Sequence, residues 1–153
     1  MEKAEQDRGM GHCCLFPSDF LDAHTRYWED GEELFEHGRL ATADHLFGLC
    51  AECGLKALMV VAGMTTDPLG VPSQEYKTHI NRLWDKFVSF AQGRTIERYA
   101  MELPVTNPFG DWYASNRYAH RRHFSRGIVE VHRDGASLIR RIVNAPQRDG
   151  VLQ

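Results

Sequence analysis

Residues 116–123 combine arginine and histidine side chains at a spacing that could serve phosphate chemistry. The stretch reads Asn-Arg-Tyr-Ala-His-Arg-Arg-His. Arginine can hold a phosphate through two contacts, and histidine is the side chain whose ordinary pKa permits proton transfer near neutral pH. At the start of a helix, such residues could bind a ribose-phosphate linkage and move protons during its cleavage. The same composition also fits a polar helix start whose arginines are simply solvated.

The spacing of Arg117 and His123 limits how they could act together. Six residues of a continuous α-helix rotate by about 600°, so the two side chains would lie about 120° apart around the axis. They would converge only if Arg117 lay in the helix cap, or if the two residues acted across a dimer interface.

A second group of ionisable side chains falls on a helix predicted for about 39–62. At about 100° per residue, His45, Glu52 and Lys56 lie within about 40° of one another. Glu52 and Lys56 are also an i,i+4 pair in the favourable order. If the rest of this helix is core, the pair needs a second charge, a backbone group or a ligand phosphate as partner. The alternative is that this stripe is the single solvent-facing edge of the helix.

Capping residues and apolar spacing predict two long helices in the first half of the chain. The first begins after the cap signal at 17–19 and ends near 37–38; the second covers about Arg39 to Ala62 and stops at Gly63. The second helix is apolar around most of its circumference and contains many small residues, so it must be largely buried. The short connection between them predicts an antiparallel pair.

The second half of the chain mixes helical patterns with proline-rich breaks, and no segment alternates like a strand. We therefore expect an all-α fold, an up-and-down bundle of four to five helices. The expected elements are a loop over 64–77, a helix from Thr78 to Gly93, a short helix around Tyr99, an irregular stretch over 104–110 and a last helix from about Ser115 to Pro146.

Length and composition predict one ordinary globular domain. The chain has 153 residues, of which 42% are hydrophobic and 25% charged, and this balance excludes extensive disorder. We expect a flexible segment over 1–16, the helical bundle over 17–146 and a tail over 147–153. No apolar run is long enough to cross a bilayer, and the first ten residues lack the apolar core of a secretory signal. We therefore expect no membrane partner and a cytoplasmic location.

The net charge of −3 is unevenly distributed. Residues 1–116 contain ten Lys or Arg and eighteen Asp or Glu, whereas residues 117–148 contain eight Arg and two acids. An arginine-rich C-terminal segment on an acidic body indicates a phosphate-bearing partner at one face, or a self-complementary oligomer. Arginines that solvate the outside of a terminal helix would give the same count.

The four cysteines do not form a disulfide or metal pattern. Cys50 and Cys53 lie deep inside the second predicted helix, away from a helix N-terminus that would lower a thiol pKa, and a second zinc-ligating pair at suitable spacing is missing. We interpret them as small buried residues, and we expect no metal and no cofactor. A metal site built from some of the eight histidines together with Cys50 and Cys53 is a weaker alternative.

Three blocks of the sequence resemble the HEPN family (higher eukaryotes and prokaryotes nucleotide-binding). Residues 51–58 (Ala-Glu-Cys-Gly-Leu-Lys-Ala-Leu) resemble the A-E-x-x-L-K-A-L signature of its second helix. Thr78-His79, followed by Leu83-Trp84, is similar to the T-H element that opens its third helix. Trp112, followed by Asn116-Arg117-Tyr118, is similar to the W…R-Y element before its final helix. The blocks occur in the family's order and span about 18–146.

The resemblance implies a helical bundle that pairs as a homodimer, in a family of metal-independent RNA-cleaving enzymes and inactive RNA- or nucleotide-binding relatives. The nucleases carry an Arg, a short spacer and a His in the last helical region, and Arg117-x5-His123 fits this pattern in length. Tyr118 departs from it, because active members often have a small polar residue there. The resemblance further implies a polar cleft lined by Glu52, Lys56, His79 and Arg117.

The sequence thus supports two hypotheses of different class. The first is an RNA- or nucleotide-interacting domain, or a metal-independent endoribonuclease of toxin or defence type. In it Arg117 holds the phosphate, His123 or His120 transfers protons, and Tyr118 and Arg121 add to the binding surface. The second is a non-catalytic dimerisation module that docks to a partner such as a nucleotidyltransferase-like protein.

Overall fold

The computed structural model describes residues 16–150, which form five α-helices joined by loops and three short 3-10 turns. Within this range the only strand-like pairing is an isolated bridge between Thr66 and Pro72, so the predicted all-α fold is confirmed. The expected segment 1–16 lies, apart from Phe16, outside the described residues. The α-helices are α1 (Phe20–Glu36), α2 (Leu40–Val61), α3 (Ile80–Ala91), α4 (Glu97–Ala100) and α5 (Arg126–Arg148), and the 3-10 turns are η1 (Gln74–Tyr76), η2 (Ala114–Tyr118) and η3 (Arg121–His123).

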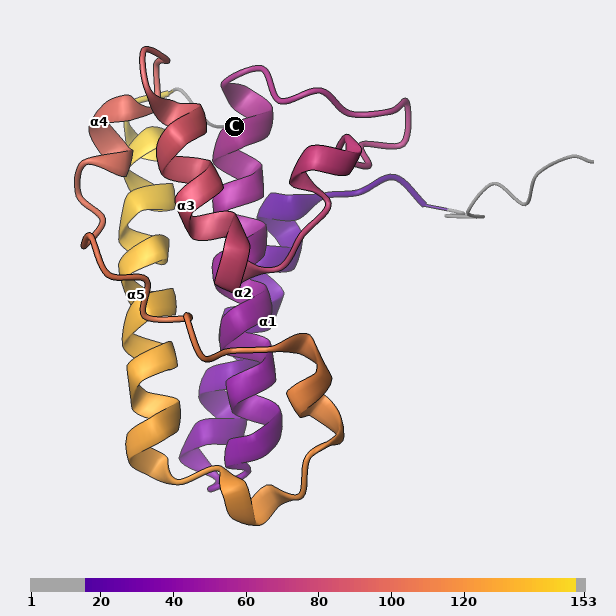
Figure 1. The fold of residues 1–153 in the computed structure, drawn as a ribbon, viewed down its shortest axis with the longest axis vertical. Coiled ribbons are helices and arrows are strands. Elements are labelled where there is room, and N and C mark those ends of the chain that lie inside the picture. Colours follow the sequence, from indigo (N-terminus) through magenta and orange to yellow (C-terminus); the bar gives the residue numbers. More distant parts are fainter. Residues whose placement is uncertain (1–15, 151–153) are drawn as a thin grey trace, which may run out of the picture.

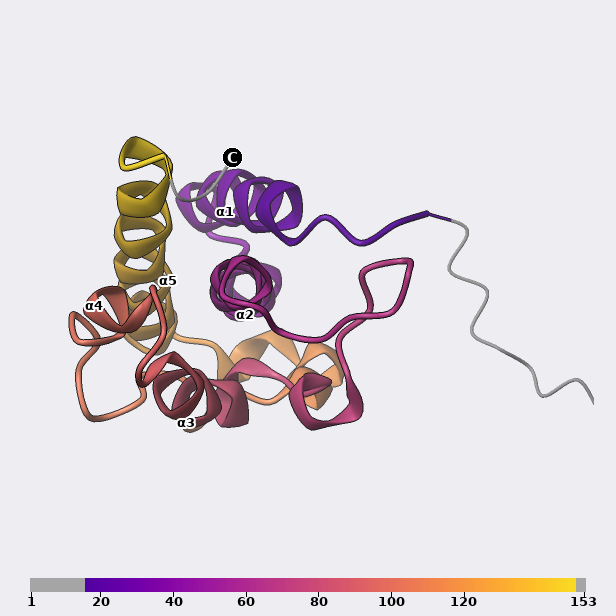
Figure 2. The same cartoon turned by 90° about the horizontal axis from the view of Figure 1, so that it is seen from above.

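Helix α2 is the centre of the bundle. Seen end-on, it has α1, α5 and α3 arranged around it (Figure 2), and α1 runs antiparallel to it after a tight turn (Figure 1). Gly38 makes this turn with a φ of 72°, a left-handed conformation that glycine adopts without strain. Fourteen of the 22 residues of α2 are buried, as its apolar circumference predicts.

Helix α1 begins and ends where the sequence predicts. The Asp19 carboxylate accepts a hydrogen bond from the backbone N–H of Asp22 at 2.9 Å and so caps the helix. Helix α3 begins one residue later than expected, because His79, and not Thr78, is its N-cap residue; the His79 backbone is extended and its side chain caps no amide.

The last helix is the main correction to the predicted fold. It begins at Arg126 and not near Ser115, because the Ser125 hydroxyl accepts the backbone N–H of Ile128 and caps the helix there. Residues 114–123, which we call the basic connection, form the turns η2 and η3 with extended residues between them. The rotation expected for a continuous helix over Arg117 and His123 therefore does not apply.

Helix α5 also runs past the expected end of the bundle at Pro146. It continues to Arg148, and the following Asp149 accepts hydrogen bonds from Arg98 at 2.9 Å and from the Tyr99 hydroxyl at 2.8 Å. The first residues of the predicted tail over 147–153 thus belong to the helix and its cap. Across residues 16–150, none of the helices has the length and apolar character that a bilayer-spanning segment requires.

Candidate functional site

A buried ion pair on α2 reaches the surface through a histidine. The Lys56 ammonium lies 2.8 Å from one oxygen of Glu52, and the His79 Nδ1 donates to the other oxygen at 3.0 Å. Glu52 is 8% exposed and Lys56 7%, whereas the His79 side chain is half-exposed. Of the two alternatives for this stripe, the structure therefore has the buried one, in which each charge needs a partner.

Local structure explains why His79 can reach Glu52. Its extended backbone immediately before α3 directs the imidazole toward α2, while Ile80, the next residue, is fully buried and anchors the helix start. The Lys56 ammonium also lies 5.8 Å from the centre of the Phe20 ring, a favourable contact for a cation. The cluster therefore joins the starts of α1 and α3 to the middle of α2.

Trp112 forms the aromatic floor beside this cluster. It is almost completely buried, and its indole N–H donates to the backbone carbonyl of Asp44 at 3.0 Å. His45 stacks on the indole with ring centres 5.6 Å apart and planes 15° apart, and His79 meets it edge-on at 6.2 Å. Gly48 leaves the space for the ring, since a Cβ at that position would overlap the indole.

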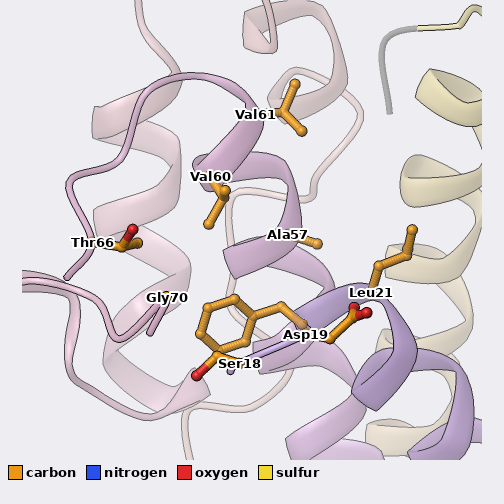
Figure 3. A pocket seen from close by; sticks show the side chains of 9 residues that line it. Ser18, Asp19, Leu21, Ala57, Val60, Val61, Thr66 and Gly70 are labelled. Carbon is orange, nitrogen blue, oxygen red and sulfur yellow. The ribbon is translucent and has the colours of Figure 1, made fainter. Parts of the chain in front are cut away.

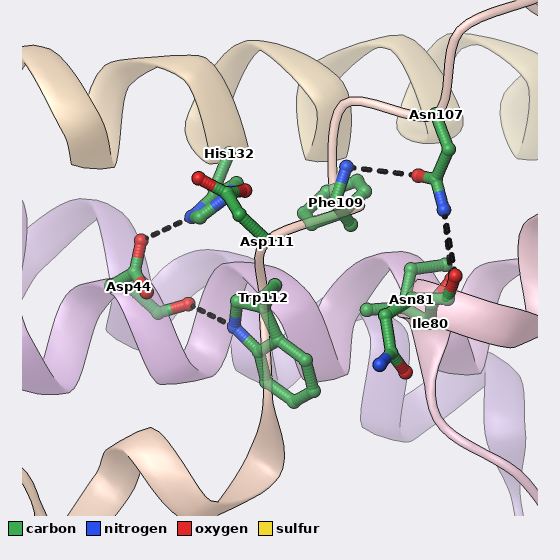
Figure 4. A network of polar contacts seen from close by, with 8 residues as sticks. All are labelled: Asp44, Ile80, Asn81, Asn107, Phe109, Asp111, Trp112 and His132. Atoms are coloured by element: carbon green, nitrogen blue, oxygen red, sulfur yellow. Dashed lines mark hydrogen bonds and ion pairs between the residues drawn. The ribbon is translucent and has the colours of Figure 1, made fainter.

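A second buried polar group fixes the position of Trp112 (Figure 4). His132 of α5 donates to Asp44 of α2 at 2.5 Å and to Asp111, the neighbour of Trp112, at 2.9 Å. His132 is 3% exposed, and burial alone would lower its pKa; the hydrogen bonds and negative charges of Asp44 and Asp111 outweigh burial, so the pKa is raised. We call this group the His132 clamp.

The segment before Trp112 is also fixed by the amide of Asn107. Its nitrogen donates to the backbone carbonyl of Asn81 at 3.1 Å, and its oxygen accepts the backbone N–H of Phe109 at 2.8 Å (Figure 4). Phe109 in turn stacks on His132 with ring centres 5.4 Å apart. The tryptophan is thus held from both α3 and α5.

Arg117 lies on the exposed turn η2. Its guanidinium is 4.8 Å from the centre of the Tyr118 ring. The pKa of His45 is lowered, first by burial and then by the positive charges of Arg117 and His79, although the charges of Asp44 and Glu52 partly offset them. The pKa of His45 therefore lies below its ordinary value of 6.5, so its imidazole is mainly neutral at neutral pH.

The other predicted site residues, Tyr118, His120, Arg121 and His123, are all exposed on the basic connection. His120 caps η3 by accepting the backbone N–H of Arg122 at 3.1 Å on its Nδ1. No hydrogen bond or ion pair within residues 16–150 joins Arg117 to His123. The structure therefore brings Glu52, Lys56 and His79 into contact and leaves Arg117 and His123 as separate exposed groups.

The buried thiols are unreactive, as their place in the core indicates. Burial raises the pKa of both Cys50 and Cys53 to about 12, and both are free. The nearby His24 donates to the Cys50 carbonyl at 2.7 Å and has its pKa lowered to about 4, mainly by burial. In the part of the chain that the structure describes, no three His, Cys, Asp or Glu side chains are placed to hold a metal ion.

A hollow of about 220 Å³ lies at the far end of α2, between the start of α1 and the loop over 66–70 (Figure 3). Its lining is mostly apolar and includes Phe20, Val60 and Val61. Its one charged lining residue is Asp19, whose carboxylate caps α1. The lining of this hollow therefore offers no cation to an anionic ligand.

No family model, curated protein or solved structure matches this chain. The resemblance to HEPN domains therefore depends on the three sequence blocks alone. In the structure these blocks lie around one place: Glu52 and Lys56 of the first contact His79 of the second, and His79 contacts Trp112 of the third.

Sequence reasoning missed Asp44, Asp111 and His132. Asp44 is a charged residue on a largely apolar helix, and this was the one available signal. The partners His132 and Asp111 are distant from it in sequence and carry no local pattern.

Proposed function

We propose that this protein is a HEPN-like helical bundle that binds RNA, with the basic connection contacting the phosphates. The observation that carries the proposal is the state of Arg117, Arg121 and Arg122. All three are exposed within six residues of chain, and none forms an ion pair with another described residue. Their full positive charge is thus available to a ligand.

Several arginines elsewhere differ in this respect. Arg26, Arg98 and Arg133 are paired with Asp22, Asp149 and Glu32 at 2.5 to 2.9 Å, so their charges are largely neutralised. The basic connection also opens the region 117–148, in which arginines outnumber acids by eight to two. A cluster of unneutralised arginines on one face is typical of nucleic-acid contact.

The dependence of binding on salt tests this proposal. For single-stranded nucleic acid, each neutralised phosphate contributes about 0.7 to the slope of log K against log salt concentration. The combined variant Arg117→Ala, Arg121→Ala, Arg122→Ala is therefore expected to lower the magnitude of this slope by about 2. The measurement is fluorescence anisotropy of a labelled RNA between low and physiological salt.

Arg141→Ala is the matched control, because Arg141 is exposed near the opposite end of α5. It changes the net charge without touching the basic connection, so we expect a smaller change in affinity for each charge removed. Equal losses per charge for the two variants would contradict the assignment of the phosphate contacts.

Metal-independent cleavage of RNA is a second candidate function, and the neutral His45 favours it. In such a reaction the ribose 2′-hydroxyl attacks the adjacent phosphate, and a neutral imidazole is the form that can accept a proton. Arg117 would hold the phosphate and His123 or His120 would transfer protons. The lowered pKa of His45 adds a neutral imidazole on α2, whose residues contact those of η2.

Incubation with mixed RNA in EDTA distinguishes cleavage from binding. If the protein is a metal-independent nuclease, we expect fragments from the wild type and a loss of about 100-fold or more in rate for Arg117→Ala and for His123→Ala. Neither variant should lower the melting temperature, because both side chains are exposed. Continued cutting by both purified variants would rule out this pair, and intact but shifted RNA would indicate binding alone.

The proposal also includes expectations that depend on the resemblance. They are a homodimer and, in the non-catalytic alternative, docking to a nucleotidyltransferase-like partner. A cytoplasmic location is expected from the sequence composition and not from the resemblance.

A further inference from the structure

Tyr118 is a large aromatic side chain for which the fold has no evident use. It is 78% exposed at the end of η2 and lies outside the core cluster. Its one described contact is the guanidinium of the neighbouring Arg117, 4.8 Å from the ring centre. An exposed aromatic ring whose only described partner is an unneutralised cation indicates a role in binding.

The order of residue types around Tyr118 indicates the chemistry of the ligand. Arg117 precedes it and Arg121 and Arg122 follow it, so cations flank an aromatic ring on one short segment. Phosphates of a nucleic acid meet arginines, and bases stack on aromatic rings and on guanidinium planes. A chain of alternating phosphates and bases matches this alternation of charged and aromatic groups.

Whether a base is free to stack on a side chain distinguishes single-stranded from double-stranded RNA as the ligand. In a duplex each base is stacked between its neighbours, and the narrow major groove of A-form RNA keeps side chains from the base edges. The ring of Tyr118 can therefore stack only on a base that is unpaired. Resting on the proposed RNA-binding function, we propose that the ligand is single-stranded RNA, with one unpaired base stacked on Tyr118 and the flanking phosphates held by Arg117 and Arg121.

The test compares three RNAs with the full-length protein and its variants. The RNAs are a labelled single strand, the duplex of the same sequence, and the single strand with abasic positions at its centre. Tyr118→Ala is expected to weaken binding of the single strand by about 5- to 150-fold, the usual range for loss of one stacked base. Tyr118→Phe keeps the ring and should bind within about twofold of the wild type.

Two controls separate stacking from other effects. The Tyr118→Ala variant and the wild type should bind the abasic strand equally, because no base remains to stack. Met101→Ala removes another highly exposed apolar side chain, on the turn after α4, and should leave all affinities unchanged. Thermal melting checks that each variant folds.

The outcomes distinguish this inference from the function on which it rests. Arginine-dependent binding that ignores both strandedness and Tyr118→Ala would overturn the stacking of an unpaired base and leave RNA binding in place. A wild type that binds neither strand nor duplex would overturn both.

Discussion

Gly48→Ala is expected to lower the free energy of unfolding by about 3 kcal/mol, at the upper end of the usual cost of overpacking a core. The added methyl would overlap Cε2, Nε1 and Cζ2 of the buried Trp112 ring. The ring cannot move aside freely, because its N–H is bonded to the Asp44 carbonyl and His45 stacks on its face. For a domain of this size, the expected fall in melting temperature is about 6 to 12 °C.

Gly127→Ala is the matched control for this substitution. Gly127 also lies on a helix, but it is exposed and no atom outside its own helical surroundings lies within 4 Å of the added methyl. Alanine is favoured over glycine in a helix by about 0.8 to 1 kcal/mol, so this variant should melt slightly above the wild type. Denaturant unfolding measures both changes. A Gly48→Ala protein as stable as the Gly127→Ala protein would contradict the close packing of α2 against Trp112.

Asp44→Ala is expected to have the largest effect on stability. It leaves the buried His132 without its shorter hydrogen bond, and breaking a buried ion pair on one side costs about 3 to 5 kcal/mol. Asp111→Ala removes the partner of the other ring nitrogen, but Asp111 is 78% exposed, so water can replace it and the loss should stay below about 1 kcal/mol. Urea unfolding of the two variants at pH 6 measures this difference.

The same clamp gives stability a dependence on pH. The folded pKa of His132 is raised above the unfolded value of 6.5, so the folded state binds the proton more tightly. The contribution of the clamp is therefore fully present below pH 6.5 and is lost as the pH rises through the folded pKa. Subtracting the unfolding free energies of Asp44→Ala from those of the wild type should isolate a difference that shrinks above pH 6.5. A difference that grows with pH there would contradict a charged His132.

His24 acts in the opposite direction and in a separate range of pH. Its folded pKa is lowered from 6.5 to about 4, so the folded state resists its protonation. Stability from this residue is present above pH 6.5 and falls as the pH drops toward 4. Since Asp44→Ala leaves His24 in place, the subtraction removes this second dependence.

Local signals in the sequence were sufficient for the first half of the fold. Asp19 caps a helix, Gly38 permits a turn of positive φ, and the apolar circumference of α2 requires burial on all sides. Each of these is a property of neighbouring residues, so it can be read without the rest of the chain. The spacing of Glu52 and Lys56 likewise places them on one face of the helix. It does not decide whether that face is buried or exposed to solvent.

The second half of the fold and the His132 clamp depend on contacts between segments that are distant in sequence. The His132 clamp joins residues that are 88 and 21 positions apart, and no spacing rule connects them. The start of α5 was misplaced because residues 114–123 contain helix-compatible side chains, while the cap at Ser125 and the extended residues Ala119 and His120 interrupt the helix. The predicted angle of about 120° between Arg117 and His123 assumed one continuous helix, so it does not apply once the helix begins at Arg126.

The central position of α2 has a consequence for how the protein unfolds. Helices α1, α3 and α5 all pack on α2, so no smaller set of elements without α2 encloses an apolar interior of its own. If α1, α3 or α5 detaches, one apolar side of α2 becomes exposed to water. Unfolding should therefore be a single cooperative transition, and a chain cut in the loop over 64–77 should keep its two pieces together until both melt at once.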